Sequence, residues 1–182
     1  MLDPVRELKV RAQILHHAVK ASESAALERL RVLVGFRKAD AEALRSAATG
    51  IQRKHCLAAV SRELGFASFE HARRVFEGDA SEADFGTLLY GTARGHLNHW
   101  FATYDQAHAL HAQTSSATGR RYLLAYKRHF FVVDRLFIES VGLDPDDADW
   151  KEIGWDWARP KSREARRRLY GKFMDAQRST AA

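Results

Sequence analysis

The sequence predicts a mainly α-helical protein: a multi-helix bundle with a helix-turn-helix-like hairpin and at most a small β-hairpin. Apolar residues recur three and four positions apart through most of the chain, and glycines and capping residues separate the segments that carry this pattern. Two aromatic and β-branched runs in the second half are the main exception. The 182 residues, 46% hydrophobic and 29% charged, are enough to fold around one core or two small ones.

The first helix is predicted to start at Asp3, which can cap it, with Pro4 in its first turn, and to run to about Ser22. Its apolar stripe consists of Val5, Leu8, Ala12, Leu15 and Val19.

Two shorter helices follow. Ser24 can cap one that ends at Gly35, and Asp40 begins another that runs to Ala48. The inner stripe of the former consists of Leu27, Leu30 and Val34.

The stretch from Ile51 to Glu77 predicts two helices joined by a turn of about three residues. Gly65 suits the left-handed conformation that ends a helix, and Ser68 can cap the helix that follows. The first helix buries a stripe made of Leu57, Val60 and Leu64. The second has an apolar side made of Phe69, Ala72, Val75 and Phe76, and an outer side made of Glu70, His71, Arg73, Arg74 and Glu77. This is the layout of a helix-turn-helix unit whose second helix can enter a DNA major groove; an ordinary helical hairpin is the alternative.

Part of this hairpin resembles a known DNA-binding family. Gly65-Phe66, followed by Arg74 and Phe76, resembles the second helix-turn-helix of the arabinose-regulator family. The chain departs from that family at Ala72, where the family has a bulky aromatic residue, and it has no second helix-turn-helix upstream.

A second resemblance covers residues 5 to 78. This part of the chain is similar to an N-terminal helical module of uncharacterised bacterial proteins, among them ankyrin-repeat and glyoxalase-related ones. The resemblance implies a helical fold and a bacterial origin, and it carries over no activity and no site. The matching positions are Leu8-Lys9, Ala12, Leu15, Ala26-Leu27, Arg29-Leu30, Ser61-Arg62-Glu63 and Gly65-Phe66-Ala67-Ser68-Phe69.

The second half opens after a change of composition near residue 78. Phe85 to Tyr90 fits either a short strand or a buried connection, and Gly95 to Gln113 fits a helix with Trp100 as a core anchor. We expect three segments: a helical module at 1–78, an aromatic-rich and mainly helical part at 79–160, and a basic helix with a tail at 161–182.

The runs Tyr122 to Tyr126 and Phe130 to Val133 predict a small β-hairpin, with a continuous helix through Leu143 as the alternative. Asp134 can cap a helix that Gly142 ends.

The next helix is predicted to carry Trp150, Ile153 and Trp157, with Asp146, Asp147 and Asp149 in its first turn. A basic helix from Lys161 to Arg178 keeps an apolar strip made of Ala165, Leu169 and Phe173. The large side chains expected in the core of this half are Trp100, Phe101, Phe131, Trp150 and Trp157.

Several features favour a cytoplasmic protein. The single cysteine, Cys56, lies on the core side of a predicted helix and suits a reducing compartment. The first 20 residues are amphipathic and do not resemble a signal peptide, and no apolar run is long enough to cross a bilayer. We therefore expect no membrane association.

The formal net charge of +6 is unevenly distributed. Residues 1–78 carry 14 lysines and arginines against 9 aspartates and glutamates, residues 79–158 carry 7 against 12, and residues 159–182 carry 8 against 2. Basic ends suit either a nucleic-acid partner or electrostatic attraction to the acidic middle.

Nine histidines raise the question of a metal site. His96-x-x-His99 and His108-x-x-His111 each place two imidazoles on one helix face, but on a single helix their starts lie 12 residues, roughly 18 Å, apart. One ion cannot bind both pairs. We predict no metal and no cofactor.

Other catalytic patterns fail for geometric reasons. The aspartates from Asp144 to Asp149 lack the glycine and glutamate of a calcium loop. His55 and Cys56 point about 100° apart on a helix, so they are no catalytic dyad. A glycine-rich phosphate loop is absent from the sequence.

The leading hypothesis is a non-enzymatic nucleic-acid-binding protein with DNA as the expected partner. The phosphate contacts expected on the hairpin and the basic C-terminal helix are His71, Arg73, Arg74, Arg166, Arg167 and Arg168. One alternative is a protein-interaction module with an exposed patch at Trp150, Trp155 and Trp157. Another is a metal-assisted or acid–base enzyme built from His96, His99, Asp105, His108 and His129. No oligomeric state follows from the sequence.

Overall fold

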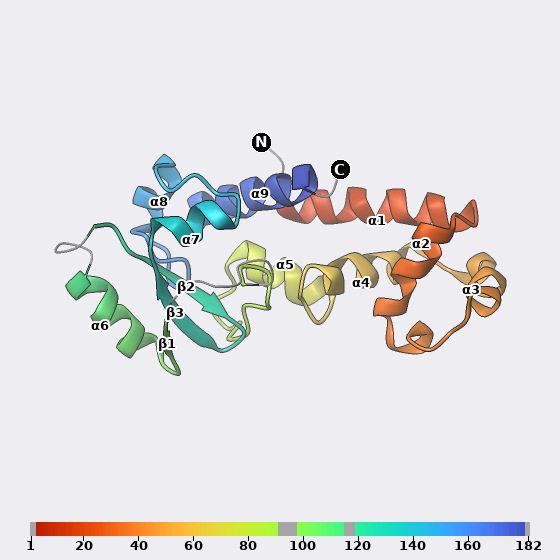
Figure 1. Ribbon diagram of the computed structural model, residues 1–182, viewed down its shortest axis with the longest axis horizontal. Helices are drawn as coiled ribbons and strands as arrows, with labels where there is room; N and C mark the ends of the chain where they lie inside the picture. The colour runs from red at the N-terminus through yellow and green to blue at the C-terminus, as the bar shows by residue number, and fades with distance from the viewer. Residues whose placement is uncertain (1–2, 91–97, 115–118, 181–182) are drawn as a thin grey trace. The chain divides into compact units, whose positions relative to one another are not determined.

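The computed structural model describes residues 3–90, 98–114 and 119–180, which form a mainly α-helical protein with a small antiparallel sheet (Figure 1). The chain divides into two compact units. The helical unit comprises Val5–Arg73, and the mixed unit comprises Met1–Pro4 together with Arg74–Ala182. Each unit is described by itself. Within the described residues, none of the helices has the length and apolar character that spanning a bilayer requires.

The helical unit is built from short helices. Its elements are α1 (Pro4–Lys20), α2 (Ser24–Arg29), α3 (Ala41–Ala47), α4 (Arg53–Glu63) and the first part of α5 (Phe69–Glu77), with 3-10 turns at Leu30–Val32, Val34–Phe36 and Ala48–Gly50. The last residues of α5, from Arg74 on, belong to the mixed unit. The predicted stripe of α1 is buried along its whole length, as is Cys56 on α4. The prediction of Asp40 as a cap is confirmed, because its side chain accepts a hydrogen bond from the Ala43 amide at 2.8 Å.

The prediction for the second helix is wrong in two respects. Ser24 lies inside α2, and the residue before it, Glu23, makes no side-chain capping bond. The helix also ends at Arg29, since Leu33 is extended (φ −81°, ψ 137°) and separates two 3-10 turns. Val34 therefore leaves the apolar stripe and is 73% exposed.

The two helices and the turn of the predicted α4–α5 hairpin are confirmed, but the predicted stripe of α4 is partly wrong, because Leu57 and Leu64 are only half-buried. Gly65 has a φ of 84°, which only glycine adopts without strain, and the Phe66 amide bonds to the Ser61 carbonyl at 2.9 Å to close α4. Ser68 caps α5 by accepting from the His71 amide at 3.1 Å.

The mixed unit is organised around three antiparallel strands, β1 (His99–Phe101), β2 (Tyr122–Tyr126) and β3 (His129–Val133), in the order β1-β3-β2. Its helices after α5 are α6 (Tyr104–Thr114), α7 (Arg135–Ser140), α8 (Ala148–Ile153) and α9 (Arg163–Thr180). The predicted β-hairpin at residues 122–133 is thus confirmed, and the alternative of a continuous helix is wrong. The segment Phe85 to Tyr90 is a connection with Leu88 and Leu89 buried.

The two faces of the sheet have different partners, because side chains alternate along a strand. One face carries Leu123, Ala125 and Val132, which pack with Ala107 of α6. The other face carries Tyr122 and Phe131. Tyr122 meets Trp150 of α8 at 4.8 Å between ring centroids, and Phe131 meets Phe137 of α7 at 5.6 Å. Figure 1 shows α6 on one side of the strands and α7 and α8 on the other.

The predicted helix from Gly95 to Gln113 is partly wrong. Residues 95–97 lie outside the described residues, but His99–Phe101 pairs with β3 as a strand and the helix begins only at Tyr104. The aromatic spacing of these residues fits a helix, but it also fits an edge strand. The strand is stabilised here because Trp100 stacks on Phe131 of β3, at 4.6 Å between ring centroids. Trp100 is consequently 42% exposed, against the prediction that it is buried.

Trp150 and Trp157 are both fully buried, as predicted, but not on one helix. The chain leaves α8 through left-handed residues at Gly154 (φ 72°) and Trp155 (φ 55°). Trp157 then enters the core in extended chain that bonds to Leu123 of β2, at 2.8 Å between the Trp157 amide and the Leu123 carbonyl.

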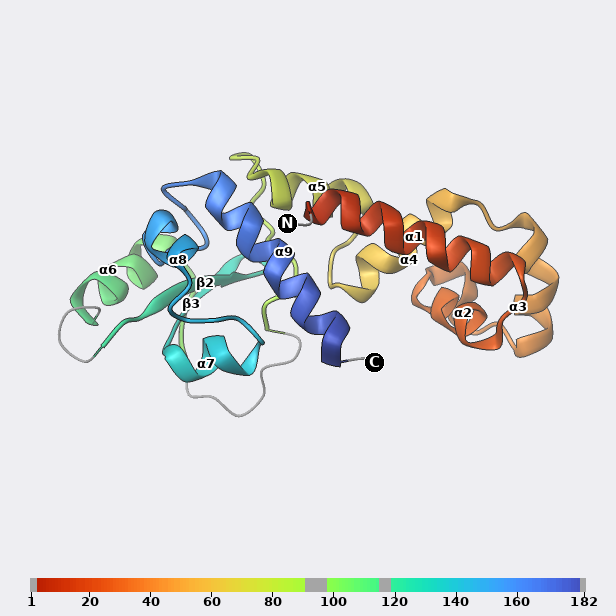
Figure 2. The same ribbon diagram turned by 90° about the horizontal axis from the view of Figure 1, so that it is seen from above.

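Helix α9 covers the core with Ala165, Leu169 and Phe173, which are buried as predicted. Figure 2 shows α9 beside α8, and charged side chains connect the two helices. Arg168 and Lys172 both bond to the carboxylate of Asp149, at 2.8 Å and 2.7 Å respectively. This aspartate therefore neutralises cations of α9 in addition to lying at the start of α8.

Candidate functional site

The three hairpin residues predicted to contact phosphates have contacts within the chain. The ring of His71 accepts a hydrogen bond from the Ala67 amide at 3.1 Å and meets Phe66 edge to face. Arg73 donates hydrogen bonds from Nε and Nη2 to the two carboxylate oxygens of Glu70, at 3.0 Å and 2.5 Å. Arg74 bonds to Asp79 at 2.9 Å. With Glu70 and Glu77 beside the two arginines, the outer face of α5 carries no net formal charge.

The three arginines predicted on the C-terminal helix differ in their surroundings. Arg166 is 4% exposed and donates to the carbonyls of Trp157 and Val75, at 3.0 Å and 3.2 Å. Arg167 bonds to Asp3, and Arg168 bonds to Asp149 and Glu152. Of the six predicted residues, His71 and Arg73 belong to the helical unit and the other four belong to the mixed unit. Among those four, Arg166 is buried, while Arg74, Arg167 and Arg168 each bind a carboxylate.

The histidine and tryptophan alternatives find no support in the described residues. His96 lies outside them, and His99 is on β1 while His108 and His111 are on α6. Among the described histidines, cysteines and acidic residues, no group of three is placed to hold a metal ion. The predicted aromatic patch is contradicted, because Trp150 and Trp157 are fully buried and Arg120 covers the ring of Trp155 at 3.6 Å.

A pocket of 530 Å³ in the mixed unit brings together arginines from three separate segments. Arg128 comes from the β2–β3 turn, Arg159 from the segment before α9, and Arg163 and Arg166 from the first turns of α9. The remaining lining residues are apolar or acidic: Val75, Gly78, Asp79, Ala80, Glu82, Ala83, Phe85, Phe130, Ala158 and Pro160.

Arg128 reaches the pocket because the β2–β3 turn is held in an unusual conformation. Lys127 has a φ of 51°, which is unfavourable for a residue with a side chain. Two main-chain bonds stabilise it: the Lys127 amide donates to the Gly86 carbonyl at 2.7 Å, and the Phe85 amide donates to the Lys127 carbonyl at 2.9 Å. The same bonds bring Phe85 to the pocket wall, so the segment after α5 and the strand turn are positioned together.

Arg159 is held by an aromatic ring and a buried carboxylate. Its guanidinium lies 3.8 Å from the ring centroid of Tyr104, and its amide donates to Asp156 at 2.8 Å. The Tyr104 hydroxyl donates to the other oxygen of Asp156 at 2.5 Å. Burial, reinforced by this hydrogen bond, raises the pKa of Tyr104, so the phenol stays protonated at neutral pH. Tyr104 therefore holds the Arg159 guanidinium in place through a cation–π contact with its ring.

The positive charge of the pocket is not balanced by neighbouring carboxylates. Arg74, which is outside the lining, forms ion pairs with Asp79 at 2.9 Å and Glu82 at 3.2 Å. The hydrogen bonds from Arg74 and Ser81 hold the pKa of Asp79 well below its usual range. In the described part of the chain, no carboxylate forms an ion pair with Arg128, Arg159, Arg163 or Arg166.

Arg166 adds a buried positive charge to the pocket. It is nine-tenths buried, both of its terminal nitrogens bond to carbonyls, and its Nε has no hydrogen-bond partner among the described atoms. A buried cation is normally accompanied by an anion, since desolvation otherwise raises its free energy. The pocket therefore suits a negatively charged ligand that the exposed guanidiniums bind and that the field of Arg166 attracts.

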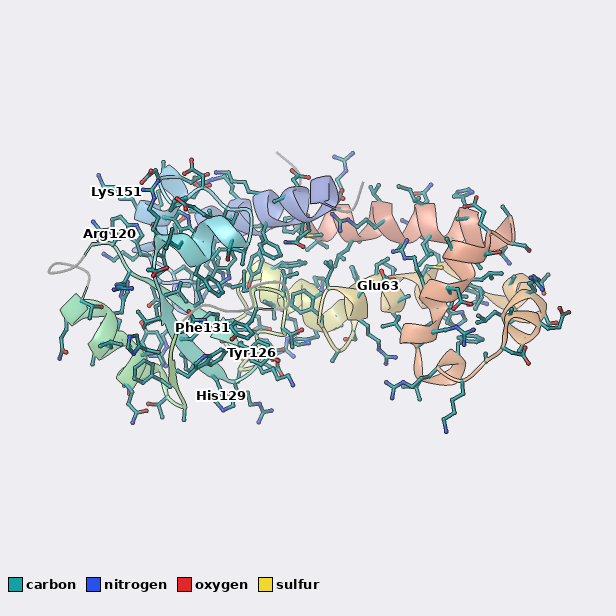
Figure 3. All side chains as sticks on the ribbon, in the orientation of Figure 1. Glu63, Arg120, Tyr126, His129, Phe131 and Lys151 are labelled. Carbon is teal, nitrogen blue, oxygen red and sulfur yellow. The ribbon has the colours of Figure 1, made fainter. Side chains whose placement is uncertain are left out.

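A second hollow, of 640 Å³, illustrates the contrast. Arg120 and Lys151, which are labelled in Figure 3, are among its lining residues. Two of its cations are paired: Arg121 lies 3.8 Å from Asp134, and Arg135 lies 2.7 Å from Asp146. Within the described residues, this hollow therefore has fewer unpaired cations than the arginine-lined pocket.

The sequence did not predict Arg128, Arg159 and Arg163 as site residues. Arg159 and Arg163 belong to the strongly basic segment after residue 158, which was the only available signal. Their convergence with Arg128 depends on the strand turn and on the chain reversal before α9, neither of which has a helical period. Compared with known proteins, the chain matches no protein-family model, no curated protein and no solved structure.

Proposed function

We propose that the protein binds nucleic acid without catalysing a reaction, and that Arg128, Arg159 and Arg163 of the mixed unit contact its phosphates. The supporting observation is the arginine-lined pocket, whose exposed guanidiniums lack carboxylate partners among the described residues. Arginine is well suited to phosphate because its planar group donates two parallel hydrogen bonds. Phosphate contacts supply most of the affinity of nucleic-acid-binding proteins.

The helix-turn-helix-like hairpin is the competing location for the same function. Its layout matches a DNA-reading unit, but the His71 ring accepts a hydrogen bond from the Ala67 amide and Arg73 is paired with Glu70. Arginines that must release a carboxylate before binding phosphate gain less from the exchange. We therefore assign the main phosphate contacts to the pocket.

The test is a salt series of binding to nucleic acid, because each lost phosphate contact lowers the slope of log K against log salt by about 0.9 for duplex and about 0.7 for single strands. We expect a variant with Arg128, Arg159 and Arg163 changed to alanine to lose about two to three units of slope. The matched control removes three exposed cations outside the pocket, Lys38, Arg45 and Arg135, and should change the slope far less.

A third variant, with Arg73 and Arg74 changed to alanine, tests the hairpin directly. A larger loss of slope from this variant than from the pocket variant would move the phosphate contacts to α5. Wild-type protein that binds neither single-stranded nor duplex nucleic acid at low salt would refute the proposed function, because electrostatic attraction is strongest under that condition.

A further inference from the structure

We propose, on the basis of the nucleic-acid-binding function above, that the pocket takes one unstacked nucleotide of a single strand, with the phosphate at the arginines and the base against Phe130. The inference concerns the form of nucleic acid that is bound. It rests on the apolar wall of the pocket, on its size, and on the placement of Phe130.

The pocket has a charged side and an apolar side. The apolar side is formed by Val75, Phe85, Phe130, Ala158 and Pro160. A nucleotide has the same division, because its phosphate is anionic and its base is a planar apolar surface with polar edges. A site that served only the phosphate backbone would have no need of such a wall.

The size of the pocket argues for a single nucleotide and against an intact duplex. Its volume of 530 Å³ is in the range of sites that enclose a small molecule. In a duplex the bases are stacked and paired, so that a protein reaches their edges with a protruding helix or strand inserted into a groove. A concave pocket can receive a base only when that base has left the stack.

Phe130 is well placed to stack with such a base. It lies on β3, opposite Ala125 of β2 and Phe101 of β1, which fixes its backbone. Phe85 and Tyr104 meet its ring at interplanar angles of 71° and 81°. No described aromatic ring stacks flat on it, and a nucleobase has the planar geometry to do so.

The neighbouring cations are positioned for the phosphate of that same nucleotide. Arg128 lies two residues from Phe130 along the chain, and Arg159 rests on Tyr104, which itself contacts Phe130. One nucleotide can therefore contact the aromatic wall and the guanidiniums together, which neither a free phosphate nor an uncharged aromatic compound can do.

The experiment compares three labelled probes of equal phosphate number with the wild-type protein: a thymidine single strand, a duplex, and an abasic single strand. We expect the thymidine strand to bind at least tenfold more tightly than both other probes. The abasic strand keeps the phosphates and removes the bases, so this comparison needs no variant that could misfold. Equal binding of the abasic and thymidine strands would overturn the inference, as would equal or tighter binding of the duplex.

Two variants separate the inference from the proposed function. Phe130→Leu should reduce the preference for the thymidine strand over the abasic strand several-fold while leaving the salt slope unchanged. The arginine-to-alanine variant of the pocket should lower the salt slope for all three probes. If all probes bind with equal affinity and a steep salt slope, the single-nucleotide inference fails and the proposed function survives; if no probe binds at low salt, both fail.

Discussion

The guanidinium of Arg166 donates from Nη2 to the main-chain carbonyl of Val75, which lies 91 residues earlier in the chain, at 3.2 Å. Through Nη1 it also bonds to the carbonyl of Trp157, at 3.0 Å. One side chain of α9 thus connects the end of α5 with the segment that follows α8. Its position at the pocket follows from this structural role.

We expect Arg166→Met to destabilise the protein by about 1–3 kcal/mol, because methionine keeps much of the volume but leaves two carbonyls without a charged donor. Arg163→Met is the control, since Arg163 is exposed and its replacement should change the free energy of unfolding by less than about 0.5 kcal/mol. Urea unfolding of both variants measures the difference. Equal stability of the two variants would contradict the structural role of Arg166.

Gly142→Ala should destabilise the protein by about 2–4 kcal/mol. Gly142 ends α7 with a φ of 81°, and a Cβ atom there would lie 2.8 Å from the Cβ of Ala176 on α9. Gly119→Ala isolates the backbone contribution, because Gly119 has a φ of 98° and no atom within 4 Å of an added Cβ. Thermal unfolding should therefore rank wild type, Gly119→Ala and Gly142→Ala in order of decreasing stability. The reverse order of the two variants would show that α7 and α9 separate readily.

His111 should make the protein less stable as the pH falls below about 6.5. The ring is 8% exposed and bonds to the Arg121 carbonyl at 3.1 Å, so it is the protonated Nε2 of the neutral imidazole that donates. Burial lowers the pKa of His111 in the folded state. The unfolded chain therefore binds the proton more readily, and the stability that neutral His111 provides at pH 7 is lost as pH falls from the unfolded pKa through the folded one.

The prediction for His111 is tested by measuring the free energy of unfolding in urea between about pH 7.5 and about pH 5. This range spans the ordinary histidine pKa. His111→Gln replaces the imidazole N–H donor by an amide N–H donor and removes the titratable group, so the free energy of unfolding of this variant should fall less over this range. His108→Gln is the control, because His108 is exposed, and it should retain the wild-type pH dependence. A flat wild-type profile would show that His111 is not held neutral.

Two aspartates of the same turn should respond very differently to removal of their charge. Asp149 has a side chain that is 6% exposed and binds Arg168 and Lys172, whereas Asp146 is 69% exposed and binds Arg135. Asp149→Asn should lower the free energy of unfolding by about 1–3 kcal/mol, and Asp146→Asn should lower it clearly less. Chemical denaturation at two salt concentrations tests both, since only the exposed pair is strongly screened.

Much of the fold could be predicted from residues that lie close together in the sequence. Asp40, Ser68 and Asp134 cap the helices for which they were predicted as caps, because a capping bond depends on residues only three positions away. The turn at Gly65 and the buried stripe of α1 were also predicted correctly, because both depend on residues close together in the sequence. The helix-turn-helix-like hairpin and the β-hairpin could therefore be recognised from sequence.

The errors arise where distant residues decide the conformation. Trp100 pairs with Phe131 across the sheet, and this contact makes a strand of residues that also have helical spacing. Trp157 reaches the core because Leu123 supplies main-chain partners for its segment. The pocket could not be predicted for the same reason, since Arg128 and Arg163 are far apart in the sequence and line the same pocket only in the folded chain.

The division of the chain also bears on the order in which the protein is made. The helical unit is continuous, whereas the mixed unit needs Leu169 and Phe173 of α9, which follows all three of its described strands, to complete its core. During synthesis from the N-terminus, the helical unit can fold once residue 73 has left the ribosome. Trp150 is fully covered only after α9 has been made, so we expect the nascent mixed unit to pass through a stage with exposed aromatic surface.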